Sequence, residues 1–363
     1  MHLAPTTEQQ ELKDAVRRFC QEQMTQERLT AWEKQPGGID AECWRAITAL
    51  GWLGLGLPVS AGGSGLGLVE VACLLEECAR GLVPRRVINA IRGGVALALV
   101  HAQSADLPAV ARGERSVTLA LDERYTRDAA AYQTRLITRG DTLQLDGEKW
   151  YVAAAAFPEI HIVAARDGDD VALVRAPGRE ATSAPLRTFD GEYQGVVRYE
   201  KVGVQRLSAP GRGTQMLRAL CRQQTALALA EMIGGMDAVL AMTVDYVKQR
   251  EQFGQKIAVF QAVQHQVADM ATAYTAGRHL AWQAITRVAA GTEEGTELAH
   301  AAAFVGQAFK RLTLTALHLH GGAGYVVEHP LHYHAERAQA LCIRYTPEAA
   351  ALESVAAALL DTA

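Results

Sequence analysis

The sequence has no excess of charge of one sign and no long apolar run. Its 36 basic and 40 acidic side chains leave a net charge of −4, and like charges do not cluster. This pattern excludes proteins that bind nucleic acid or charged membranes through a basic surface. The apolar runs are too short to span a bilayer, and the first residues lack the pattern of a secretory signal. We therefore expect a cytoplasmic protein with no nucleic-acid and no membrane partner.

The sequence also lacks the cysteine and histidine spacings of metal sites. None of its six cysteines forms a CxxC pair, which favours small buried side chains over metal or redox chemistry. Five of the eleven histidines occur between His318 and His334, but no HExxH motif and no other zinc spacing accompanies them. We expect no metal.

What the sequence contains is a change of pattern along its length. Helical periodicity dominates residues 1–115 and begins near Thr7, which stands three residues before Gln10 in capping-box spacing. Short runs rich in Val, Thr, Tyr and Leu fill residues 116–205, including separate runs at 142–146 and 150–155, and predict a small antiparallel sheet or barrel. Four long helices at 225–249, 261–290, 297–320 and 347–360 predict a four-helix bundle within residues 206–363. The predicted fold class is therefore α+β, with a helical N-terminal domain, a middle antiparallel β domain and a C-terminal bundle.

A glycine cluster at residues 62–67 invites a nucleotide-binding interpretation. Ser64 stands where GxGxxG requires its second glycine, and no clear strand precedes the cluster. A tight loop that needs positive backbone angles is the favoured interpretation.

Two blocks in the last third carry the most specific pattern. The first is Arg250-Glu-Gln-Phe-Gly254, followed by Phe260-Gln261 at the start of a helix. The second is His318-Leu-His-Gly321-Gly322-Ala-Gly324-Tyr325. An arginine can pair with a phosphate in a bidentate manner, and paired glycines let the backbone approach an anion where a Cβ would clash. The alternative for Arg250 is a surface ion pair with Glu251 or a helix-end cap, and a core position is an equal alternative for Phe260.

These blocks resemble the acyl-CoA dehydrogenase family. Residues 55–67 ahead of a helix, and residues 145–152 in the β region, match the family pattern in the same order, so the resemblance covers nearly the whole chain. The resemblance implies FAD and an oligomer in which these groups reach the flavin of a neighbouring subunit. It assigns the ADP half of the cofactor to Arg250, Gln252, Phe253, Phe260, Gln261, His318, Gly321 and Gly322, and the isoalloxazine to Tyr151 and Ala153.

The sequence departs from the family at the catalytic base. The family removes an α-proton from an acyl thioester with a glutamate. Counting without gaps, its two known locations fall on Tyr345 and Gln224. Tyrosine titrates near 10 and glutamine does not titrate, so neither is a base at neutral pH. Glu231 and Glu348 are the fallback candidates.

Other departures point the same way. Ala153 stands where the family has a hydroxyl side chain near the flavin, a conserved loop is reduced to Asp122-Glu123-Arg-Tyr, and His318 replaces a glutamine. The resemblance includes bacterial subunits that work with a non-identical partner, which can supply the missing base.

The implied function is FAD-dependent α,β-dehydrogenation of an acyl-CoA or acyl-carrier-protein thioester in lipid metabolism. Two alternatives stay open. One is a subunit without a base in a hetero-oligomer, and the other is a different flavin reaction, such as an oxidase or monooxygenase.

Overall fold

The computed structural model describes residues 4–35, 38–153, 160–186, 188–292 and 296–360. The chain divides into two compact units. Unit 1 comprises Met1–Ala31, Gly67–Val83 and Gln224–Ala363, and unit 2 comprises Trp32–Leu66 and Pro84–Gln223. Along the chain, helices are followed by a sheet and then by helices again, which confirms the predicted fold class. The bounds of the three predicted domains stay a prediction.

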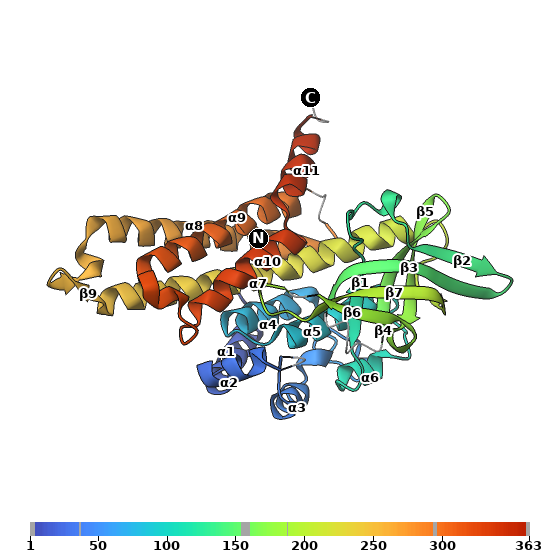
Figure 1. Ribbon diagram of the computed structural model, residues 1–363, viewed down its shortest axis with the longest axis horizontal. Coiled ribbons are helices and arrows are strands. Elements are labelled where there is room, and N and C mark those ends of the chain that lie inside the picture. Colours follow the sequence, from blue (N-terminus) through green and yellow to red (C-terminus); the bar gives the residue numbers. More distant parts are fainter. Residues whose placement is uncertain (1–3, 36–37, 154–159, 187, 293–295, 361–363) are drawn as a thin grey trace. The chain divides into compact units, whose positions relative to one another are not determined.

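Within its described residues, unit 1 is helical apart from one hairpin (Figure 1). It contains α1 (Thr7–Gln23), α4 (Leu68–Arg80), α8 (Gln261–Ala290), α9 (Thr296–His320), α10 (Leu331–Tyr345), α11 (Glu348–Leu360) and most of α7 (Gly213–Gln249), with the 3₁₀ turns η5 (Ile257–Val259) and η6 (Gly321–Tyr325). The hairpin pairs β9 (Glu251–Gln252) with β10 (Gln255–Lys256), and α2 (Gln26–Glu33) spans the boundary between the units.

Two glycines let neighbouring helices pack directly on α7. A Cβ at Gly234 would lie 1.9 Å from the Glu76 carbonyl oxygen of α4, and one at Gly235 would lie 2.4 Å from the Phe309 ring of α9. Any side chain at these positions would therefore push α4 or α9 away. Among the described residues, α7 alone is long and apolar enough to cross a membrane, but 72% of its apolar window is buried inside the protein, as in a core helix.

Unit 2 combines short helices with an eight-stranded sheet. Its helices are α3 (Ala41–Ala49), α5 (Arg85–Val100) and α6 (Leu107–Ala111), with the 3₁₀ turns η1 (Trp52–Gly54), η2 (Val59–Ala61), η3 (Ala129–Ala131) and η4 (Gly178–Glu180). The strands are β1 (Val117–Ala120), β2 (Arg135–Arg139), β3 (Thr142–Ala153), β4 (Ile160–Asp167), β5 (Asp170–Pro177), β6 (Thr182–Leu186), β7 (Gln194–Gly203) and β8 (Gln205–Arg206).

The sheet runs in the order β6-β7-β3-β2-β4-β5-β8, and β1 pairs with β4. Its core is a cluster of fully or nearly fully buried side chains that includes Leu145, Val163, Val174, Val197 and Tyr199. The β1–β4 and β2–β4 pairs are parallel, so the sheet is mixed where the sequence predicted antiparallel pairing throughout. Composition and turn spacing identify strands, but they do not fix which strands pair.

Three details of the elements differ from the sequence prediction. The capping box lies one residue earlier, at Thr6 and Gln9, where each side chain bonds the other's backbone N–H. The predicted runs at 142–146 and 150–155 are one strand, β3, up to Ala153, and residues 154–155 lie outside the described residues. The structure has one helix, α10, beyond the four C-terminal helices that the sequence predicts. The buried stripe of α10 contains His334, which interrupts the apolar period, so the pattern does not reveal this helix. The loop glycines are confirmed, since Gly62 and Gly65 have φ of 78° and 68°.

Candidate functional site

The predicted arginine block forms an exposed hairpin at one end of unit 1, beyond the last turn of α7 (Figure 1). Arg250 follows α7 directly, and its carbonyl oxygen accepts a hydrogen bond of 2.9 Å from the Ile257 N–H, which closes the hairpin. Phe253 and Gly254 form the turn, with φ of 57° and 77°. The Phe253 side chain is 91% exposed and meets the Phe260 ring edge-on at 6.1 Å. The Phe260 side chain is partly exposed.

The glycine block lies at the end of α9 and is exposed as well. His318 is in the last turn of α9, and Gly321 begins η6 with a φ of 57°. At both Gly321 and Gly322 a Cβ would find no atom within 4 Å. The space in front of this backbone is therefore open, as an approaching anionic group requires.

A side-chain contact that the sequence did not predict links the two blocks. The Tyr246 hydroxyl donates a hydrogen bond of 3.2 Å to the His320 carbonyl oxygen, and the two rings stack with centroids 4.3 Å apart. Tyr246 lies one helical turn before Arg250, and His320 immediately precedes Gly321. His320 is itself fixed by a 2.8 Å contact from its Nδ1 to the Ala316 carbonyl oxygen. The helix spacing between Tyr246 and Arg250 was the available signal, but the partner on α9 could not be read from it.

The cationic side chain of this surface is Arg250. Among the described residues, the Arg250 guanidinium has no hydrogen-bond or ion-pair partner, so the alternative pairing with Glu251 is not formed. Gln252 and Gln261 are exposed beside it. An exposed arginine, an exposed aromatic ring and an open glycine backbone together suit the pyrophosphate and adenine of a dinucleotide.

The two residues predicted to lie along the isoalloxazine belong to β3 in unit 2. Tyr151 stands in a bulge against β7, with φ of 57° and a 40% exposed side chain. Ala153 is buried, and its carbonyl oxygen accepts a hydrogen bond of 2.8 Å from the Thr118 hydroxyl of β1. Tyr151 and Ala153 therefore occupy a distorted strand end, as is common where a strand meets a ligand.

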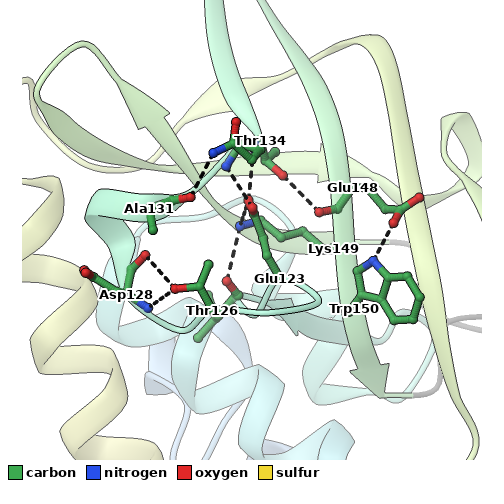
Figure 2. A network of polar contacts seen from close by, with 10 residues as sticks. Glu123, Thr126, Asp128, Ala131, Thr134, Glu148, Lys149 and Trp150 are labelled. Carbon is green, nitrogen blue, oxygen red and sulfur yellow. Dashed lines mark hydrogen bonds and ion pairs between the residues drawn. The ribbon is translucent and has the colours of Figure 1, made fainter.

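Beside this strand end, a buried ion pair fixes the shortened loop at Asp122 and Glu123 (Figure 2). The Glu123 carboxylate accepts bonds from Lys149 Nζ at 3.0 Å, from Thr134 N–H at 2.9 Å and from Gln133 N–H at 2.8 Å. Lys149 also donates to the Leu121 carbonyl oxygen at 3.2 Å. Burial lowers the pKa of Lys149 to about 8, against the pull of Glu123. Burial also pushes the Glu123 pKa upward, but its backbone donors and Lys149 outweigh burial and leave the pKa lowered.

The two positions predicted for a catalytic base lie on different helices, α7 and α10, and both belong to unit 1. Gln224 is buried on α7, and Tyr345 is half-buried at the last residue of α10. The fallback Glu231 is buried on α7 close to Cys78 of α4. Burial is the main cause that raises the pKa of the Cys78 thiol, and the charges of Cys20 and Glu231 raise it further. The fallback Glu348 begins α11 and accepts a hydrogen bond from Gln307 of α9. The Glu348 carboxylate is thus bonded to a neighbouring helix.

Comparison with known proteins identifies the family. The model of the acyl-CoA dehydrogenase N-terminal domain matches residues 6–113, and that of the C-terminal domain matches residues 211–360. The chain belongs to the acyl-CoA dehydrogenase family. Acyl-CoA dehydrogenases are FAD-dependent oxidoreductases, and the exposed arginine and open glycine backbone described above fit that cofactor.

Similar proteins within the family differ in what they are named for. The 3-sulfinopropanoyl-CoA desulfinase of Paraburkholderia xenovorans is 27% identical over 88% of this chain and 89% of its own. A variant of the Tcur3481-Tcur3483 steroid ACAD is 28% identical, with a TM-score of 0.90 over 98% of both chains. A chain of the ChsE4-ChsE5 complex from Mycobacterium tuberculosis shares the fold. It is 24% identical to this protein, with a TM-score of 0.92, and the match covers the whole of this chain and of that chain.

Proposed function

We propose that this protein takes part in the FAD-dependent α,β-dehydrogenation of an acyl thioester, and that its own chain lacks the usual base. The claim that the chain lacks the base rests on the residue types at the two positions where the family has its catalytic glutamate. Gln224 is buried and Tyr345 is half-buried, and neither residue carries the carboxylate that the family uses as its base. When bound, FAD supplies the hydride acceptor, while this chain binds and orients the cofactor through Arg250 and the Gly321–Gly322 backbone.

A second subunit is part of this proposal. In the part of the chain that the structure describes, the Arg250 guanidinium has no partner and the backbone at Gly321 and Gly322 faces open space, so we infer that they serve a flavin at a subunit interface. The relatives named as the Tcur3481-Tcur3483 enzyme and the ChsE4-ChsE5 complex are pairs of different chains, which supports a hetero-oligomer. We place the protein in the cytoplasm and in acyl thioester metabolism, with acyl-CoA and acyl-carrier-protein thioesters as the candidate substrates.

Restoring a carboxylate tests the proposal. Purified flavoprotein is mixed anaerobically with acyl-CoA, and bleaching of the flavin is followed for the unmodified protein and for Gln224→Glu and Tyr345→Glu. A positioned base contributes about 10²–10⁴-fold, so one of the two variants should bleach faster by a factor in this range. Gln223→Glu is the matched control, because it adds the same carboxylate at the next residue, about 100° around the helix.

Three other results have distinct meanings. Fast bleaching of the unmodified homo-oligomer contradicts a missing base, and Glu231→Gln and Glu348→Gln then show which carboxylate acts. Activity that requires a second chain supports the hetero-oligomer. No gain from either carboxylate, with oxygen consumed by the reduced flavin, contradicts dehydrogenation and favours an oxidase or monooxygenase.

A further inference from the structure

A pocket lies within unit 1, and none of its lining residues is assigned to the cofactor or the base. It has a volume of about 250 Å³ and is enclosed by the start of α1, by α4 and by α8. Pro5, Val69 and the Trp282 ring supply apolar walls, and Lys13 and Arg278 supply the charges. With a water molecule occupying about 30 Å³ of liquid, the pocket holds roughly eight water-sized groups.

Two carboxylates of α4 beside this pocket, Glu76 and Glu77, are paired with cations. Lys13, only 5% exposed, lies 2.6 Å from Glu76 Oε2 and 3.4 Å from Glu77 Oε1. Glu77 also receives two bonds from the Arg17 guanidinium, at 2.8 and 3.0 Å. Each of these two glutamates is thus matched by a lysine or an arginine.

Two side chains at the pocket have hydrogen-bond donors without an acceptor among the described residues. The Arg278 guanidinium is partly exposed and has no hydrogen-bond or ion-pair partner among the described residues. The Trp282 side chain is 7% exposed, and its Nε1–H is buried without an acceptor. A buried donor without a partner is energetically unfavourable, and α8 places these two donors one helical turn apart, on one face. Among the described residues, the pocket therefore has one guanidinium without a hydrogen-bond or ion-pair partner and one buried N–H without an acceptor.

We propose that this pocket binds a small carboxylate with a short apolar tail, such as a free acid of about six carbons. The planar fork of a guanidinium matches a carboxylate in two parallel hydrogen bonds. The Trp282 ring and Val69 provide apolar surface for the tail, and the limited volume excludes a nucleotide or a CoA thioester. A carboxylate neutralises Arg278 and brings acceptor atoms to the side of the pocket that Trp282 lines.

Calorimetric titration of the full-length flavoprotein with sodium hexanoate tests this site, with hexylamine as the probe of opposite charge. A ligand of this size should bind with a Kd on the order of 1 mM or tighter. Arg278→Gln should weaken hexanoate binding about tenfold to a hundredfold, because it removes a charged hydrogen-bond partner. Trp282→Phe keeps the ring but removes the N–H, and should weaken binding by roughly threefold to tenfold. Arg311→Gln, beside a different pocket on α9, should leave the Kd unchanged.

Three results would overturn the proposal. These are a hexanoate Kd weaker than about 10 mM, equal binding of hexylamine, or hexanoate binding that Arg278→Gln leaves unchanged. Thermal melting of each variant verifies that it is folded, and Trp282→Phe keeps the proposal testable if Arg278→Gln is unstable. Hexanoate that is displaced by hexanoyl-CoA would place the binding at the thioester site and would also contradict the proposal.

Discussion

The hairpin end of unit 1 and the Glu123–Lys149 pair of unit 2 use polar residues in opposite ways. At the hairpin end, Phe253 is 91% exposed, Arg250 has no partner among the described residues, and the glycine backbone faces open space. In unit 2, Lys149 is fully buried, and the buried Glu123 accepts three hydrogen bonds, two of them from the buried Lys149 and Thr134. The polar groups of the first region are available to bind a group outside the chain, whereas those of the second region bond to one another and stabilise the fold. Mutations should therefore affect ligand binding in one region and stability in the other.

The largest effect on folding should come from breaking the buried pair. Lys149→Met leaves the Glu123 carboxylate buried without its cation, and loss of one partner of a buried pair costs about 3–5 kcal/mol. Urea unfolding measures the change. Arg135→Met is the control, since its pair with Asp146 is largely exposed and such pairs contribute about 0–1 kcal/mol. Equal losses in the two variants would contradict the contrast between buried and exposed pairs.

The sheet should also lose stability in acid through His161. This side chain is buried on β4 with its Nδ1 2.8 Å from the Tyr199 hydroxyl, and burial lowers its pKa from 6.5 to about 4. Because the folded pKa lies below the unfolded one, the unfolded chain binds the proton first as the pH falls. The sheet should lose about 3 kcal/mol between pH 6.5 and 4. Denaturant unfolding across this pH range should show the slope, and His161→Phe should reduce it. An unchanged slope in that variant would assign the acid sensitivity to other groups.

A smaller effect, and one on binding alone, is expected at the hairpin end. Arg250→Ala removes one charged hydrogen-bond partner, worth about 1.5–3 kcal/mol, and should weaken FAD binding roughly tenfold to a hundredfold. Fluorescence of released flavin during dilution measures the affinity. Arg139→Ala, exposed on β2 in the other unit, is the control. Undiminished flavin retention in Arg250→Ala, or a large loss of folding stability in it, would remove the contrast between the regions.

The sequence was informative where a motif is local. Arg250 with Phe253, and Gly321 with Gly322, are read from a few adjacent residues, and helical periods predicted most of the long helices. Partners distant in sequence were not accessible in this way. The Glu123–Lys149 pair spans 26 residues and joins a loop to β3, and Tyr246 meets His320 across 74 residues. Such pairs depend on strand order and helix packing, which a single sequence does not specify.

The base positions show the same limit within the candidate site. Gln224 and Tyr345 follow from counting residues without gaps, and one inserted residue in α7 would rotate a different side chain to the same place. The chemistry of glutamine and tyrosine is certain, but the geometry that makes a residue a base depends on the cofactor and the thioester. For that reason the missing base stays a prediction, whereas the family is shown by matches along most of the chain.

The most direct test of the account is where the flavin resides in the assembled protein. Sedimentation velocity, followed at both protein and flavin absorbance, separates a single 39.1 kDa chain from its oligomers and reports the flavin on each. If the exposed hairpin end serves a flavin at a subunit interface, flavin should sediment only with the oligomer, and Arg250→Ala should release it without dissociating the chains. A single-chain species that carries one flavin per chain would contradict the account.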